Sequence, residues 1–204
     1  MILADCHVHS AFSDDCETPV EQMIETAIAQ GKKYFYLTDH QDFDYPVMDD
    51  GVTFQLAQEP YVRRMEELKY QYKDKIDIRI GVELGLMAHI KDKTEAYAKA
   101  YDYDFIIGSS HMVNGVDPYY PAYYADKNEY QAYEQYFLSI LDNVKAYDCY
   151  HVYGHLDYIM RYVPNQTKPY DPMAYGDIFR EILKTIIDHG KGIEVNTGSL
   201  YKGF

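Results

Sequence analysis

Short apolar segments alternate along the chain with longer amphipathic segments of helical period. The apolar runs are typical of buried strands and occupy residues 2–9, 34–38, 76–83, 104–108, 150–154 and 192–196. Between them, apolar side chains recur at helical spacing over residues 19–31, 60–72, 94–100, 130–147 and 171–190. Because strands that alternate with helices favour a parallel sheet, the pattern predicts the α/β class.

Local signals sharpen the boundaries of the first helix and the second connection. Thr18 is a candidate N-cap, Pro19 suits the first helical position, and Glu21 completes a capping box. Residues 41–59 are acidic and predict a long loop over the carboxyl end of the sheet. No linker or change of composition divides the chain, so a single domain over residues 1–204 is expected.

Composition narrows the classes of function. The 204 residues are 47% hydrophobic, which suffices for a packed core, and the net charge of -14 counts against a nucleic-acid partner. Three widely spaced cysteines without a CxxC pair favour a reduced, cytoplasmic protein. The N-terminus lacks the features of a signal peptide, and no run approaches the roughly 20 apolar residues of a membrane span, so no membrane partner is expected.

Polar residues that could carry chemistry follow nearly every predicted strand. In chain order they are His7 and His9, His40, Glu83, His111, His155 and Asn196. The carboxyl ends of parallel barrel strands are where active sites form, so these side chains are expected to share one site. Packing alone does not account for imidazoles and carboxylates at so many strand ends.

Two histidines at the first strand end have the spacing of metal ligands. His7 and His9 are two residues apart, which places both side chains on one face of a strand, and neutral imidazoles suit a divalent ion. A lone His-x-His is more often structural, so this hypothesis depends on the other strand ends. Asp39 should point to the face opposite His40 and act as its partner or as a strand-end cap, and Asp14 is expected to be solvated.

Several motifs resemble those of the PHP superfamily, in the same order. They are Asp-Cys-His-Val-His-Ser at 5–10, Phe-Ser-Asp-Asp at 12–15, Thr-Asp-His at 38–40, Gly-Val-Glu at 81–83, Ile-Gly-Ser-Ser-His at 107–111 and Tyr-Gly-His-Leu-Asp-Tyr at 153–158. The Phe-Ser-Asp-Asp and Gly-Ser-Ser-His segments, His155-Leu156-Asp157 with Arg161, and residues 194–197 are most similar to the histidinol-phosphate phosphatases. The resemblance extends to about Gly198.

The resemblance implies a distorted TIM-like (β/α)7 barrel around a site for two or three divalent ions, with Zn, Mn and Fe all suited to such ligands. It implies that His7, His9 and Glu83 hold the first ion, that Glu83 bridges to a second held by His111 and His155, and that Asp15 and His40 hold the third. Asp15 stands where many relatives carry His. The implied catalytic residues are His7, His9, Glu83, His111 and His155, and the implied substrate-binding residues are Ser13 and Arg161.

The resemblance is incomplete at the C-terminus. Such families end with a Gly-Ser-Asp-x-His motif on a seventh strand, whereas this sequence stops at Phe204 before any such motif. We therefore expect the domain to be C-terminally incomplete, with the last βα unit missing from the chain.

The implied activity is metal-dependent hydrolysis of L-histidinol phosphate, a reaction of histidine biosynthesis. No Cys-x5-Arg loop or other covalent phosphatase nucleophile is present in the sequence, so water activated by the metal ions is the expected nucleophile. Asp42, Asp44, Asp49 and Asp50 are expected to accept the amino group of this small phosphorylated substrate.

Two alternatives remain open at this point. One is another PHP phosphoesterase, acting on nucleotides, sugar phosphates or phosphotyrosine. The other is a non-catalytic metal-binding or interaction domain that lacks the last ligand strand. The sequence leaves the oligomeric state undetermined.

Overall fold

The computed structural model describes residues 2–47, 51–164 and 171–198, and it confirms the α/β class. The chain forms two compact units. The first comprises the chain up to Leu84 together with Tyr97–Ile107, and the second comprises Gly85–Ala96 and the chain from Gly108 onward. Strands β4 (Asp77–Gly85) and β5 (Phe105–Ser109) both run from the first unit into the second. The single domain and the seven-unit barrel stay predictions.

The first unit is built on a parallel sheet. Strand β1 (Ala4–Asp5) pairs with β2 (Tyr34–Leu37), and β2 pairs with β4, so that Tyr34 lies opposite both Ala4 and Asp77. Strand β3 (His40–Asp42) also pairs with β4. The N–H of Asp104 donates to the carbonyl of Ile80 at 2.8 Å, which brings the start of β5 to the other edge of β4.

Strand β4 is the buried centre of this sheet. From Ile80 to Gly85 every residue is buried, as expected for a parallel strand covered on both faces. At Gly81 a Cβ would lie 2.7 Å from the carbonyl oxygen of Phe105 and 2.9 Å from that of Leu37. Glycine therefore allows the neighbouring backbone to approach closely, two residues before Glu83.

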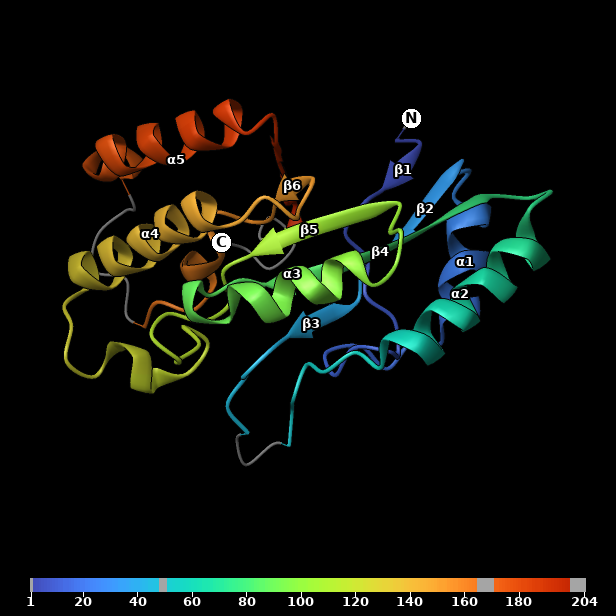
Figure 1. Ribbon diagram of the computed structural model, residues 1–204, viewed down its shortest axis with the longest axis horizontal. Helices are drawn as coiled ribbons and strands as arrows, with labels where there is room; N and C mark the ends of the chain where they lie inside the picture. Colours follow the sequence, from blue (N-terminus) through green and yellow to red (C-terminus); the bar gives the residue numbers. More distant parts are fainter. Residues whose placement is uncertain (1, 48–50, 165–170, 199–204) are drawn as a thin grey trace. The chain divides into compact units, whose positions relative to one another are not determined.

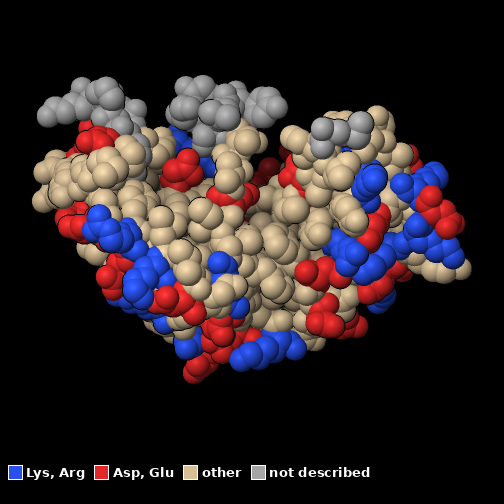
Figure 2. All heavy atoms as spheres, turned by 90° about the horizontal axis from the view of Figure 1, so that it is seen from above, with Lys and Arg blue, Asp and Glu red and all other residues tan. Residues whose placement is uncertain are grey.

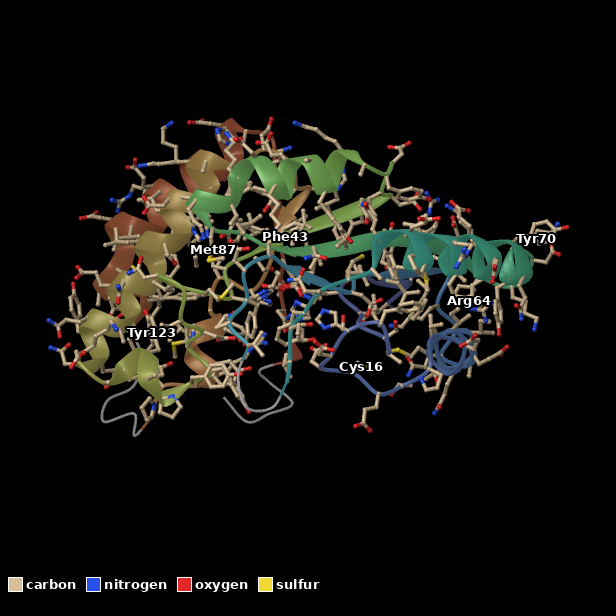
Figure 3. All side chains as sticks on the ribbon, turned by 60° about the horizontal axis from the view of Figure 1, so that its bottom comes forward. Cys16, Phe43, Arg64, Tyr70, Met87 and Tyr123 are labelled. Carbon is tan, nitrogen blue, oxygen red and sulfur yellow. The ribbon has the colours of Figure 1, made fainter. Side chains whose placement is uncertain are left out.

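Helices α1 (Val20–Ala29) and α2 (Gln58–Tyr72) belong to the same unit. The predicted cap of α1 is wrong: Pro19 occupies the N-cap position and no side chain caps the helix. The carboxylate of Glu21 instead forms an ion pair with Arg64 of α2. Figure 3 shows Arg64 on the side of α2 toward α1, whereas Tyr70, 73% exposed, projects at the far end of that helix.

The second unit pairs β6 (Val152–Tyr153) in parallel with β7 (Gly192–Ile193). The N–H of Gly154 donates to the carbonyl of Gly108 at 2.9 Å, which brings the end of β6 beside β5. Helices α4 (Glu129–Ala146) and α5 (Gly176–Asp188) lie side by side (Figure 1), and α3 (Lys91–Lys99) spans the boundary between the two units in sequence. The prediction of a helix over 130–147 is confirmed within one residue at each end.

Two predicted boundaries differ from the structure. His40–Asp42 form a separate strand, β3, where the sequence predicts the end of the second strand at His40 and a loop from residue 41; pairing with β4 buries all three polar side chains. The first strand covers only Ala4–Asp5, so His7 and His9 follow it in a loop. Asp49 and Asp50, expected to contact the substrate, lie outside the described residues.

The surface is charged but mixed. Figure 2 shows Lys and Arg side chains interspersed with Asp and Glu side chains on the face that it presents. Among residues 2–47, 51–164 and 171–198, no helix combines the length and the apolarity that crossing a membrane requires.

Candidate metal centre

The first unit brings five of the predicted metal ligands together. The loop after β1 carries His7, His9 and Asp15, strand β3 begins with His40, and strand β4 carries Glu83. The side chain of Glu83 is fully buried, and those of His7, His9 and His40 are 10–16% exposed. Three segments that are distant in the sequence thus supply one polar cluster.

The carboxylate of Glu83 is the centre of this cluster. Its Oε2 atom lies 3.0 Å from Nε2 of His7, 3.1 Å from Nε2 of His9 and 3.3 Å from Nδ1 of His40. The two Nε2 atoms of His7 and His9 are themselves 3.1 Å apart. Zn–N distances of about 2.0–2.1 Å place neighbouring donors of a tetrahedral site roughly 3.3 Å apart, so His7, His9 and Glu83 fit a divalent cation.

A second group of donors adjoins the first. Oδ2 of Asp15 lies 2.9 Å from Nδ1 of His9 and 3.6 Å from Nε2 of His40. In each group, one donor atom per residue lies within 4.8 Å of the others. His9 belongs to both groups and faces each with a different ring nitrogen, so two neighbouring cations are compatible with these five residues.

Protonation follows from this arrangement. Burial disfavours the charged form of His9, but hydrogen bonds with Asp15 and Glu83 outweigh it and raise the pKa of His9 to about 10. Burial would raise the pKa of Asp15, yet hydrogen bonds with His40 and His9 hold it well below its usual range. The cluster therefore holds protons between imidazole and carboxylate groups, and an incoming cation has to displace them.

Asp39 organises the backbone around the cluster. Its buried carboxylate accepts from the N–H of Ser10 at 2.7 Å and from the hydroxyl of Ser13 at 2.9 Å. Burial raises the pKa of Asp39, although these hydrogen bonds act in the opposite direction. Asp39 is thus a strand-end partner, as the sequence indicates. The hydroxyl of Ser13 also accepts from the N–H of His40 at 2.8 Å, and its predicted contact with substrate stays a prediction.

Sequence reasoning missed the contact between Asp42 and His40. Asp42 is fully buried, and its Oδ2 lies 3.1 Å from Nδ1 of His40. Asp42 therefore lies in a strand and not in the predicted surface loop, and its contact with the substrate's amino group stays a prediction. Residues two apart on a strand point to the same face, so His40 and Asp42 would have been recognised as neighbours if a strand had been predicted at this position.

The second unit holds the other two predicted histidine ligands. The rings of His111 and His155 are buried, and their centroids are 5.4 Å apart. The ring of Tyr158 lies 5.5 Å from His111 and 5.2 Å from His155. The backbone N–H of His155 donates to the carboxylate of Glu194 at 2.9 Å, which fixes the chain at the end of β6.

Arg161 joins this histidine pair through Tyr158. Its guanidinium lies 5.6 Å from the centroid of the Tyr158 ring, within the range of a cation–π contact. The hydroxyl of Tyr158 donates to the buried carboxylate of Asp117 at 3.1 Å. Sequence reasoning missed the role of Asp117, which lies in a loop and belongs to no motif. The predicted phosphate contact of Arg161 stays a prediction.

Comparisons with known proteins agree with this geometry. Residues 5–198 match the model of the PHP domain. The histidinol-phosphatase of Lactococcus lactis subsp. lactis is 34% identical over 95% of this chain and 71% of its own length. A crystal structure of the Lactococcus lactis histidinol phosphate phosphatase, complexed with Zn, L-histidinol and phosphate, superposes with a TM-score of 0.89 at 33% identity, covering 95% of this chain and 73% of that one.

Proposed function

The chain belongs to the PHP-domain family, and on that basis we propose that it hydrolyses L-histidinol phosphate to L-histidinol and phosphate. The observation that carries the proposal is the convergence of His7, His9 and His40 on the buried carboxylate of Glu83. The similarity to histidinol-phosphatases supports the choice of substrate.

The proposed site holds two or three divalent ions, with Zn favoured by the neighbouring structure and Mn or Fe suited to the same ligands. His7, His9, Asp15, His40 and Glu83 supply the nitrogen and oxygen donors of the first unit. His111 and His155 are proposed as further ligands on the match of their motifs. When bound, such ions polarise phosphoryl oxygens and lower the pKa of a bound water molecule to about 7.

The residues of the chain prepare the site for these cations. Glu83 supplies a negative charge at a position closed to solvent, where it offsets the charge of the cations. Asp42 lies against Nδ1 of His40 and can accept a hydrogen bond from an Nδ1–H group, which leaves the lone pair on Nε2, the nitrogen that faces Asp15. This hydrogen bond favours the tautomer in which Nε2 of His40 can bind a metal ion.

Arg161 and Ser13 complete the proposal on the substrate side. The planar guanidinium of Arg161 can form two parallel hydrogen bonds to a phosphate, and its position over the Tyr158 ring restricts its orientation. Ser13 is proposed to act in the same site. The proposal includes the (β/α)7 barrel that the motif resemblance implies.

A substrate panel tests this function. Phosphate release from L-histidinol phosphate, p-nitrophenyl phosphate, nucleotides and sugar phosphates is measured with metal-loaded protein and after chelation. We expect kcat/KM for L-histidinol phosphate to exceed kcat/KM for each of the other substrates by at least about tenfold. Hydrolysis should stop after chelation and resume when Zn, Mn or Fe is added. If kcat/KM is tenfold higher for another phosphate monoester, that monoester is the better candidate for the substrate. If the protein binds metal but hydrolyses no substrate, a non-catalytic domain is favoured.

A further inference from the structure

Adjacent carboxylates in the loop between β1 and α1 have different partners. Asp15 faces the imidazoles of His9 and His40. Asp14 was expected to be solvated; it is exposed, but its Oδ2 atom accepts from the N–H of Thr53 at 2.7 Å and from the N–H of Phe54 at 2.8 Å. Figure 3 labels Cys16, the residue that follows this pair.

The segment that Asp14 binds has an unusual backbone. Phe54 has a φ of 47°, in the left-handed region that costs energy for a residue with a bulky side chain. Its N–H is bound by Asp14, and its carbonyl accepts from the N–H of Asp42 at 2.9 Å. Hydrogen bonds on both sides of Phe54 thus maintain a conformation that the residue would not adopt alone.

This conformation directs the phenyl ring onto a proposed metal ligand. The ring centroid of Phe54 lies 4.7 Å from that of His40, and on another side it packs edge to face against buried Tyr45 at 4.9 Å. His40 is therefore restricted by Asp42 at Nδ1, by the Ser13 hydroxyl at its backbone N–H and by Phe54 against its ring.

We infer that Asp14 and Phe54 are positioning residues for His40: Asp14 binds the backbone of residues 53–54, and the Phe54 ring then fixes the orientation of the His40 imidazole. The inference rests on the proposed metal centre but on no particular substrate. Neither residue supplies a metal ligand. Their effect is on the ion that His9, Asp15 and His40 would hold, rather than on the fold as a whole.

Metal affinity measured without any substrate tests the inference. The binding of Co²⁺ to metal-depleted protein is followed by its visible absorption and by equilibrium dialysis. Asp14→Ala should weaken binding of the ion that His9, Asp15 and His40 would hold by roughly 10–100-fold, the usual cost of losing a group that orients a ligand. Asp14→Asn, whose amide oxygen can still accept the two N–H groups, should stay within about threefold of the wild type.

Two further variants separate positioning from charge and from folding. Glu17→Ala removes the same charge from the same loop at an exposed side chain, and it should leave Co²⁺ binding unchanged. Phe54→Gly removes the ring, but glycine adopts a positive φ easily. It should therefore weaken binding of the same ion, and its melting temperature should be at least as high as that of Phe54→Ala.

The outcomes are decisive in both directions. Weakened binding in Asp14→Ala and Phe54→Gly, with near-normal binding in Asp14→Asn and Glu17→Ala, supports the inference. Equal losses in Asp14→Ala and Asp14→Asn would assign the effect to charge and overturn it. Wild-type affinity in Phe54→Gly would also overturn it. Because hydrolysis is measured separately, a wild type that binds Co²⁺ but releases no phosphate would count against the proposed function alone.

Discussion

The two units hold their histidines in different surroundings. In the first unit the imidazoles of His7, His9 and His40 face carboxylate oxygens, which raise the pKa of His9 to about 10. In the second unit the rings of His111 and His155 lie against the aromatic ring of Tyr158, and the nearby Asp117 carboxylate binds the tyrosine hydroxyl.

The difference indicates how each region contributes to binding. Carboxylates around buried imidazoles provide the negative charge that a cation needs, so the first unit should dominate metal affinity. Aromatic packing around the second pair fixes ring orientation and places a guanidinium nearby, so the second unit should dominate the contacts with substrate. Four predictions test this division.

The largest effect is expected from Glu83→Gln. The substitution keeps the shape of the side chain but removes the charge around which three imidazoles gather. We expect loss of at least one bound ion and a fall in kcat of roughly 10²-fold or more. Elemental analysis and steady-state kinetics measure both, with Glu67→Gln on the exposed face of α2 as the matched control. Near-normal turnover with full metal content would refute the central place of Glu83.

Arg161→Ala should have the next largest effect, without loss of metal. Losing a charge-assisted hydrogen bond to phosphate should lower kcat/KM by about 1–3 kcal/mol for every phosphate monoester alike. Arg180→Ala on α5, where the side chain is 74% exposed, is the control. Parallel kinetics on L-histidinol phosphate and p-nitrophenyl phosphate test the prediction, and a loss confined to one substrate would contradict a phosphate contact.

The pH dependence of metal affinity follows from His9. Its raised pKa means that the metal-free protein keeps a proton there at every pH below about 10, and the metal requires the neutral ring. Affinity should therefore rise with pH, by about tenfold per unit for one displaced proton, between pH 6.5 and 8.5. Asp15 stays ionised in this range, because its pKa is lowered, and releases none. Competition with a chelator at three pH values measures the slope; a flat profile would contradict the account.

The smallest effect is expected from Tyr158→Phe, which keeps the ring against both histidines. It removes the hydroxyl that donates to Asp117 and leaves a buried carboxylate with one partner fewer. Unfolding in urea should show a loss of about 1–3 kcal/mol in stability, with little change in metal content. A fall in metal content would instead show that the hydroxyl of Tyr158, and not its ring, positions His111 and His155.

The sequence revealed the ligands of the first unit because apolar strands mark their own ends. The β4 pattern identifies Glu83 in this way, and local motifs identify His7 and His9. The sequence could not reveal β3, since its three polar residues become buried only through pairing with β4. The Thr18 cap failed for a related reason: a local rule assigned Glu21 to the helix end, whereas Arg64 of another helix binds it. A positive φ at Phe54 has no signature in the residue type.

The central claim is that His7, His9 and Glu83 bind a divalent metal ion. Anomalous diffraction from crystals of the active, zinc-loaded protein, collected above and below the zinc edge, tests it most directly. The account predicts an anomalous peak within about 2.0–2.3 Å of Nε2 of His7, Nε2 of His9 and Oε2 of Glu83. A fully active crystal with no zinc peak among these three atoms would contradict it.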